Sequence, residues 1–130
     1  MSKLDTLIQD LVIANRILAK EDVVDAYGHI SVRHPDNPNH FFISRSLAPE
    51  LIEKDDIVEL DLDGQPVGDE KRSLYLERFI HAGIYHHPSI GIFYLKSSPG
   101  HFAGIVTAPF HYIAPFPNAF SIFYIIDAGR

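Results

Sequence analysis

The stretch Asp25-Ala26-Tyr27-Gly28-His29-Ile30-Ser31-Val32-Arg33 is the most informative part of the chain. Ile30 and Val32 alternate with Ser31 and Arg33, and this period of two predicts a β-strand. A glycine followed by polar residues at the start of a strand offers backbone N–H groups and small side chains to an anion. The stretch therefore predicts both the beginning of a sheet and one side of a binding site.

The segments that follow predict the rest of a sheet. A turn rich in proline and asparagine at 35–39 leads into a return strand at 40–44. A third strand at 57–61 ends at a tight Asp63-Gly64 turn, and an apolar run at 90–95 has the length of a buried strand. Because short turns join antiparallel strands, we expect a mainly antiparallel sheet.

Two amphipathic helices are predicted to cover this sheet. Apolar residues recur at helical spacing over 3–19 and again over 74–86. Residues 99–108 are predicted to form a further short helix, and 120–126 are strand-like. Together these elements predict one α/β domain over residues 1–130, in about three layers with the sheet in the middle.

Composition excludes several classes of function. The 130 residues include 11 basic and 17 acidic ones, and this net charge of −6 argues against a nucleic-acid partner. No run of about 18 apolar residues is present, so no membrane-spanning segment is expected. The chain has no cysteine, which is compatible with a cytoplasmic protein. Charge nearly disappears after residue 90, so residues 93–130 are expected to diverge from the pattern of 1–92.

Polar residues of the two hairpin strands are candidates for a binding site. Facing strands bring hydroxyl groups, backbone N–H groups and one guanidinium together, and such groups bind carboxylate or phosphate oxygens. The alternative is an ordinary surface hairpin whose polar residues face outward. The residues concerned are His29, Ser31, Ser44, Arg45 and Ser46, beside Gly28.

Glu77 is the candidate acid or base. It lies in the second predicted helix among apolar neighbours, and His81 follows four residues later on the same side. The pair can act as metal ligands, as a coupled acid–base pair, or as an exposed contact of small value. The other histidines are expected at the surface or in packing, and these are His34, His40, His86, His87, His101 and His111.

Several segments follow one another in the order of a known family. They are Ala14-Asn15-Arg16-Ile17-Leu18, Asp25 to Arg33, Ile43-Ser44-Arg45-Ser46-Leu47-Ala48-Pro49-Glu50, Asp55-Asp56-Ile57-Val58, Asp61-Leu62-Asp63-Gly64, and Glu77-Arg78-Phe79-Ile80-His81 with Ile84-Tyr85. Over residues 7–92 the chain thereby resembles the class II aldolase/adducin family. Within this family, the sequences of these segments most resemble the branch that includes decarboxylases of hydroxylated aromatic acids.

The resemblance implies a three-layer α/β/α domain with a mainly antiparallel central sheet, assembled into homo-oligomers. It implies a carbon–carbon lyase, an aldolase or a decarboxylase of a hydroxylated carboxylic acid, with Glu77 as acid/base. The glycine–serine and serine–serine segments would hold a small anionic substrate. A divalent metal, commonly zinc, would polarise the substrate oxygen.

The metal motif departs from the family pattern. Family members carry a His-x-His followed by Ser-Pro, whereas this chain has Tyr94 and Lys96 at the histidine positions, before Ser98-Pro99. An ammonium group repels a cation, so no metal ligand is assigned. Two hypotheses follow: a lyase, or a non-catalytic family member or truncated fragment that serves binding and assembly.

Overall fold

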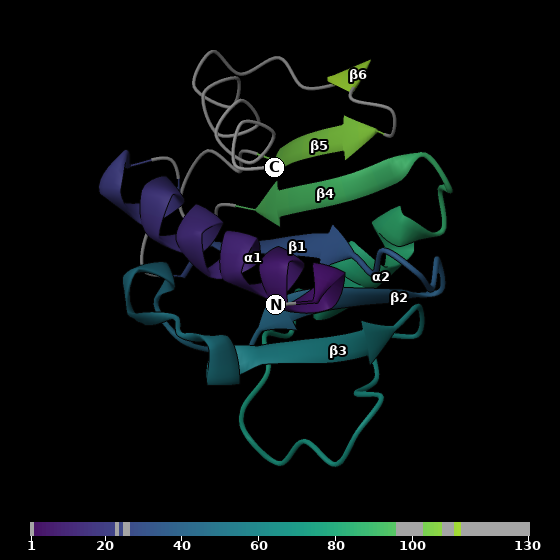
Figure 1. The fold of residues 1–130 in the computed structure, drawn as a ribbon, viewed down its shortest axis with the longest axis horizontal. Helices are drawn as coiled ribbons and strands as arrows, with labels where there is room; N and C mark the ends of the chain where they lie inside the picture. The colour runs from purple at the N-terminus through teal and green to yellow at the C-terminus, as the bar shows by residue number, and fades with distance from the viewer. Residues whose placement is uncertain (1, 23, 25–26, 96–102, 108–110, 113–130) are drawn as a thin grey trace.

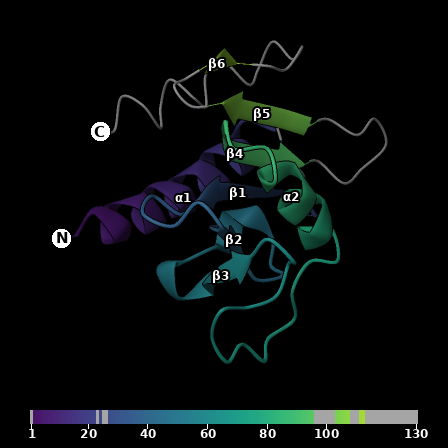
Figure 2. The same cartoon turned by 90° about the vertical axis from the view of Figure 1, so that its right-hand side faces the viewer.

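In the part of the chain that the structure describes, the architecture is a six-stranded antiparallel sheet between two helices. The computed structural model describes residues 2–22, 24, 27–95, 103–107 and 111–112. The strand order is β3-β2-β1-β4-β5-β6, with α1 across one face of the sheet and α2 against the other (Figure 1 and Figure 2). The elements are α1 (Lys3–Lys20), β1 (His29–Arg33), β2 (His40–Ser44), β3 (Ile57–Asp61), α2 (Arg78–Tyr85), β4 (Ile90–Leu95), β5 (Ala103–Thr107) and β6 (His111–Tyr112), with the single-turn 3-10 helices η1 (Pro49–Leu51) and η2 (Lys54–Asp56). The predicted three layers and antiparallel sheet are confirmed.

Helix α1 follows its predicted bounds because its first turn is capped. Ser2 Oγ accepts the backbone N–H of Asp5 at 3.0 Å, and the Asp5 carboxylate accepts the backbone N–H of Ser2 at 3.1 Å. This capping box satisfies two N–H groups that the first turn leaves unbonded.

Within the described residues, neither helix combines the length and the apolar character needed to cross a bilayer.

The pleat of β1 sorts its side chains between two cores. Ile30 and Val32 pack with α1 in one core. His29 and Ser31, which alternate with them, face α2 and make hydrogen bonds to its side chains. The strand is buried on both faces, so its polar side chains must find protein partners beneath α2.

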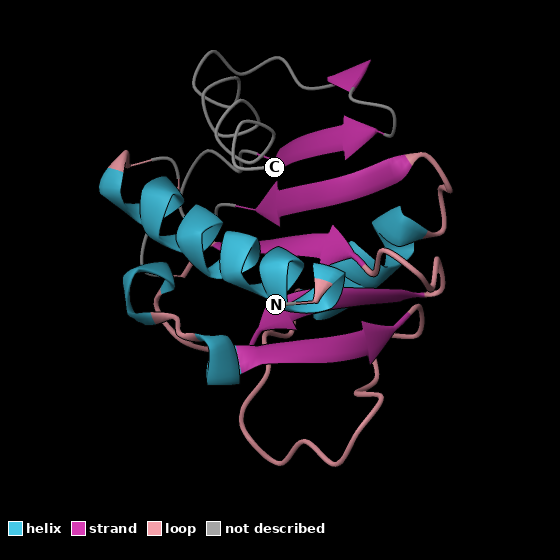
Figure 3. Cartoon of the chain, in the orientation of Figure 1, coloured by secondary structure: helices cyan, strands magenta, loops and turns pink. Residues whose placement is uncertain are grey.

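Helix α2 begins four residues later than the spacing predicts, at Arg78 rather than at residue 74. The preceding segment is the end of a long irregular connection from β3 (Figure 3). Ser46 donates its N–H to the Ser73 carbonyl at 2.8 Å, and the Tyr75 hydroxyl bonds both backbone groups of Leu47. These long-range bonds hold residues 73–75 against the 46–47 segment, so they cannot join the helix.

The predicted helix at 99–108 is wrong where the structure describes it. Residues Ala103–Thr107 form strand β5, which pairs antiparallel with β4. Ile105, Val106 and Thr107 are β-branched and suit a strand, and β4 offers them unpaired backbone groups along its edge. The strand-like residues 120–126 lie outside the described residues.

Gly64→Ala should lower the free energy of unfolding by about 1–3 kcal/mol. Gly64 has a φ of +76°, and an added Cβ would lie 2.7 Å from Cδ1 of Phe79. Urea unfolding measures the difference. Gly68→Ala is the matched control, because no atom lies within 4 Å of its added Cβ. Equal losses in the two variants would contradict this account of the turn.

Candidate functional site

A hydrogen-bonded chain of four buried side chains links β1 to α2. His29 Nδ1 lies 2.7 Å from His81 Nε2, His81 Nδ1 lies 2.5 Å from Ser31 Oγ, and Ser31 Oγ lies 2.8 Å from the Tyr85 hydroxyl. His29, Ser31 and His81 each have 0% of their surface exposed. The alternative of an outward-facing polar hairpin is therefore wrong for His29 and Ser31.

The surroundings of His81 differ from an exposed helical contact with Glu77. Its ring packs edge-on against Phe93, with ring centroids 4.6 Å apart, and lies parallel to the ring of Phe41. Burial lowers the pKa of His81 well below the ordinary value of 6.5, and the neighbouring His29 acts in the same direction. His81 is therefore neutral at pH 7 and joins β1 to α2 through both ring nitrogens.

Tyr75 stands at the centre of the candidate site, and the sequence analysis did not single it out. Its ring centroid lies 4.5 Å from that of His29, and its hydroxyl accepts the Leu47 N–H at 3.2 Å while donating to the Leu47 carbonyl. Burial raises the pKa of Tyr75; the Ser44 hydroxyl opposes this rise, and the nearby Glu77 carboxylate adds to it. Tyr75 therefore packs on His29 and lies near Ser44 and Glu77. Helical spacing over 74–86 gave no signal for this role.

Arg45 was predicted to contact an anion, and the structure pairs it with Asp56 instead. The Arg45 Nε donates to Asp56 Oδ1 at 2.7 Å, and the Arg45 backbone N–H donates to the Asp56 carbonyl at 2.7 Å. Both side chains are partly buried. The guanidinium therefore serves the junction of β2 with η2 in this conformation.

The backbone N–H groups of Ser46 and Leu47 and the Ser44 hydroxyl are also directed toward the protein. The Ser46 N–H bonds Ser73 and the Leu47 N–H bonds Tyr75, as described above, while the Ser46 side chain is exposed. Ser44 Oγ is buried and lies close enough to Tyr75 to affect its pKa, yet among the described residues it makes no direct hydrogen bond. The backbone N–H groups and the guanidinium that were predicted to bind an anion are thus bonded to protein groups, and their role in anion binding stays a prediction.

Glu77 lies at the N-terminal end of α2, as its N-cap residue, rather than inside the helix. Its side chain is half-buried, and its carbonyl accepts the Ile80 N–H at 2.9 Å. Gly28, the residue before β1, is buried. The structure places Glu77 beside Tyr75, and its role as acid/base stays a prediction.

The described residues do not fit a zinc ion. The Tyr94 side chain packs in the core beneath α1, on the face of the sheet opposite Ser31, and Lys96 lies outside the described residues. Across the ranges that the structure describes, no three histidine or carboxylate side chains are grouped to hold a metal. His29 and His81 bond each other through their facing nitrogens. No chemistry through a metal is derived from this part of the chain.

His34 and His40, which the sequence placed at the surface or in packing, lie near the same carboxylate, that of Glu59. His40 Nδ1 lies 2.7 Å from Glu59 Oε1, and His34 Nε2 lies 3.8 Å from the same oxygen. Nδ1 of His34 accepts the N–H groups of Asp36 and Asn37 at 3.0 and 3.1 Å. Nδ1 of His34 is thus occupied by two backbone donors, and the cluster ties the β1–β2 turn to β3 through Glu59.

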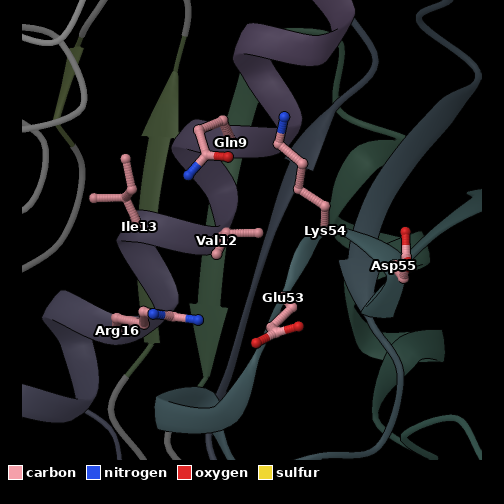
Figure 4. A pocket seen from close by; sticks show the side chains of 7 residues that line it. All are labelled: Gln9, Val12, Ile13, Arg16, Glu53, Lys54 and Asp55. Atoms are coloured by element: carbon pink, nitrogen blue, oxygen red, sulfur yellow. The ribbon is translucent and has the colours of Figure 1, made fainter.

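A groove of about 340 Å³ lies on α1, away from these residues (Figure 4). Arg16 forms part of its wall and donates to the Ile52 carbonyl at 3.2 and 3.0 Å. The groove contains none of the predicted site residues, and its two cations are balanced by two carboxylates. It is lined by Gln9, Val12, Ile13, Arg16, Glu53, Lys54 and Asp55.

His81 should make the protein less stable as the pH falls below about 6.5. Its pKa is lowered in the folded state, so the unfolded chain binds the proton first. Below the ordinary pKa, the free energy of unfolding should therefore fall by about 1.4 kcal/mol for each pH unit. The contribution is fully present above that pH. Urea unfolding at pH 7.5, 6 and 5 measures this slope.

Two substitutions separate His81 from the other titrating groups. His81→Gln should flatten the slope, whereas His87→Gln, which changes an exposed ring, should leave it unchanged. If His81→Gln does not fold, the native protein still decides: a stability independent of pH between 6.5 and 5 contradicts the buried neutral ring.

The chain is similar in sequence and in structure to several known proteins. Over 71 residues the chain is 49% identical to the decarboxylase tropJ of Talaromyces stipitatus, an alignment that covers 53% of this chain and 27% of that protein. The L-fuculose 1-phosphate aldolase of Glaciozyma antarctica has a similar structure, with a TM-score of 0.63 and 26% identity over 75% of this chain and 44% of its own. The chain thus spans less than half the length of either protein.

A further solved structure shows the shared fold. An aldolase II superfamily protein from Pseudomonas syringae matches with a TM-score of 0.64 and 23% identity over 76% of this chain and 42% of its own. The family described as Class II Aldolase and Adducin N-terminal domain matches residues 9–98, which is more than half of the chain. The chain belongs to the class II aldolase and adducin N-terminal domain family.

Proposed function

We propose that this domain serves a carbon–carbon lyase, an aldolase or a decarboxylase that acts on a small anionic, hydroxylated acid. The observation that supports this most is the packing of the Tyr75 ring on His29 of β1, with Ser44 of β2 and Glu77 at the start of α2 near enough to affect the pKa of Tyr75. Family membership supports the reaction class. The named activities of the relatives belong to those proteins and enter here as candidate reactions.

Glu77 is proposed as the acid/base. Breaking a carbon–carbon bond leaves an electron pair on one carbon, which an acid must protonate; in an aldol cleavage, a base must first take the hydroxyl proton. One carboxylate that gains and loses a proton can do both. Glu77 is half-buried, so it is open enough to meet a substrate and covered enough for a directed proton transfer.

Substrate binding is proposed to move Tyr75. His29 is fully buried and its ring lies against Tyr75, so displacing this side chain would open His29 to an anion. The same displacement would release the Leu47 N–H and uncover Ser44. We propose that Gly28, His29, Ser31, Ser44, Arg45 and Ser46 then bind or shape the anionic end of the substrate.

The family also leads us to propose a divalent metal, with zinc the commonest candidate. The described residues provide no set of three ligands, so no step is assigned to the ion. One zinc per purified chain would require ligands from other parts of the chain or from a second copy.

We also propose a cytoplasmic location, with which the absence of cysteine is compatible.

A homo-oligomer is proposed from exposed apolar residues around the start of α2. Leu76, which precedes the helix, and Phe79 and Ile80 in its first turn are 79%, 48% and 49% exposed. Exposed apolar side chains gathered at one place mark interaction surfaces more often than isolated ones do. We call these three residues the α2 patch, and a second copy that covers it would also cover Glu77 from solvent.

A second candidate function is non-catalytic assembly. The inward-facing donors of the 44–47 segment favour it, because a binding module does not require an open anion site. The two functions differ in whether Glu77 matters for turnover.

Glu77→Gln should reduce carbon–carbon cleavage by about 100-fold or more, because the amide cannot transfer the proton. Aldehyde release from L-fuculose 1-phosphate and carbon dioxide release from hydroxylated aromatic acids are suitable assays. Glu50→Gln, on the exposed surface of η1, is the matched control and should keep full activity. Activity that survives in Glu77→Gln, or no cleavage by the native protein, would favour the assembly function.

Leu76→Asp should shift the protein from oligomer to monomer in light scattering, since a charge in the α2 patch disfavours burial. Leu51→Asp provides the control, because Leu51 is 57% exposed on η1, outside the patch. A native protein that is monomeric, or a Leu76→Asp variant that remains oligomeric, would contradict the assembly through α2.

A further inference from the structure

We propose that His81 is a positioning residue that fixes the ring hydrogen of His29 on Nε2. The proposal rests on the proposed function, in which the His29 segment meets the anionic end of the substrate. It specifies the chemical form of the imidazole that the substrate meets, a neutral ring that presents an N–H group. The position of this hydrogen follows from the hydrogen bonds of the buried chain that runs from Tyr85 to His29.

The chain begins at Tyr85, which keeps its hydrogen. Its side chain is 1% exposed, and burial raises the pKa of Tyr85 above its ordinary value. The Arg33 guanidinium carbon lies 5.0 Å from the ring centroid, but a guanidinium carries only donors and cannot accept the phenol hydrogen. Ser31 Oγ, at 2.8 Å, is the side-chain acceptor for the Tyr85 hydroxyl.

The Ser31 hydroxyl can donate its one hydrogen to either of two candidate acceptors. His81 Nδ1 lies at 2.5 Å, and the Phe93 carbonyl oxygen lies at 3.4 Å. The shorter contact lies within the usual range for a hydroxyl donor, whereas the longer one lies well outside it. The Ser31 hydroxyl therefore donates to His81 Nδ1.

This bond settles the hydrogens of the two histidines. His81 is neutral and carries one ring hydrogen, and because Nδ1 accepts from Ser31 that hydrogen lies on Nε2. His81 Nε2 and His29 Nδ1 are 2.7 Å apart, a distance that holds a single hydrogen. His29 Nδ1 is therefore the acceptor, and the hydrogen of a neutral His29 lies on Nε2.

The consequence for chemistry is a defined polarity at His29. An N–H group at Nε2 donates to a carboxylate or phosphate oxygen and does not ligate a metal. A second orientation of the chain would reverse this polarity: His81 Nδ1 would donate to Ser31, Ser31 would donate to Phe93, and His29 would carry its hydrogen on Nδ1. The two orientations differ in a directly measurable property, the protonated nitrogen of each ring.

Long-range proton–nitrogen NMR of the full chain with 15N-labelled histidine tests this at pH 7. Protonated and unprotonated ring nitrogens have widely separated shifts, and His29→Gln and His81→Gln assign the signals. His34 is an internal reference, because its Nδ1 accepts two backbone N–H groups. We expect His29 and His81 to be neutral with the hydrogen on Nε2. A hydrogen on Nδ1 of His29 overturns the proposal.

Ser31→Ala tests whether the orientation is transmitted. Without the Ser31 hydroxyl, His81 Nδ1 loses its donor, so the signals of His29 should change from one tautomer to a mixture. Tyr85→Phe is a second, milder variant with the same expected direction. If His29 keeps one tautomer in both folded variants, His81 has no positioning role. The measurement needs no substrate, so an inactive protein with the expected tautomers refutes the proposed function alone.

Discussion

The hydrogen-bonded chain from Tyr85 through Ser31 and His81 to His29 is the constraint on which the rest of the structure depends. β1 is the third strand of six and is covered on both faces, so its polar side chains have no access to water. An unsatisfied buried polar group costs about 1–3 kcal/mol. His81 and Tyr85, four residues apart on α2, make hydrogen bonds to His29 and Ser31, and this pairing fixes both the height and the rotation of the helix above the sheet.

The placement of α2 in turn determines the candidate site. At the end of the helix, Arg33 of β1 donates to the carbonyls of Tyr85, His87 and Ile90 at 2.7 to 2.9 Å, so the helix is also held at its C-terminus. At its beginning, the helix carries Glu77 as its N-cap residue, near Tyr75, whose ring packs on His29 at the start of β1. The acid/base candidate and the segments proposed to bind an anion are thus connected through packed and bonded side chains rather than lying on independent loops.

The sequence predicted those features that are encoded locally. Alternation over β1 and helical spacing over α1 were confirmed within one or two residues, because each pattern follows from the local spacing of apolar residues. The start of α2 was missed because it depends on bonds from residues 73–75 to the distant 46–47 segment. The burial of His81 and the central position of Tyr75 were missed for the same reason, since both depend on packing between elements. The strand β5 was missed because its pairing with β4 outweighs local spacing.

A double-mutant cycle on Ser31 and Tyr85 tests the central claim most directly. The free energies of unfolding of the native protein, Ser31→Ala, Tyr85→Phe and the double variant give the coupling between the two hydroxyl groups. Because they share one buried bonded chain, we expect a coupling of about 1 kcal/mol or more, in the range found for residues of one network. Effects that add to within about 0.3 kcal/mol, as for independent sites, would contradict the account.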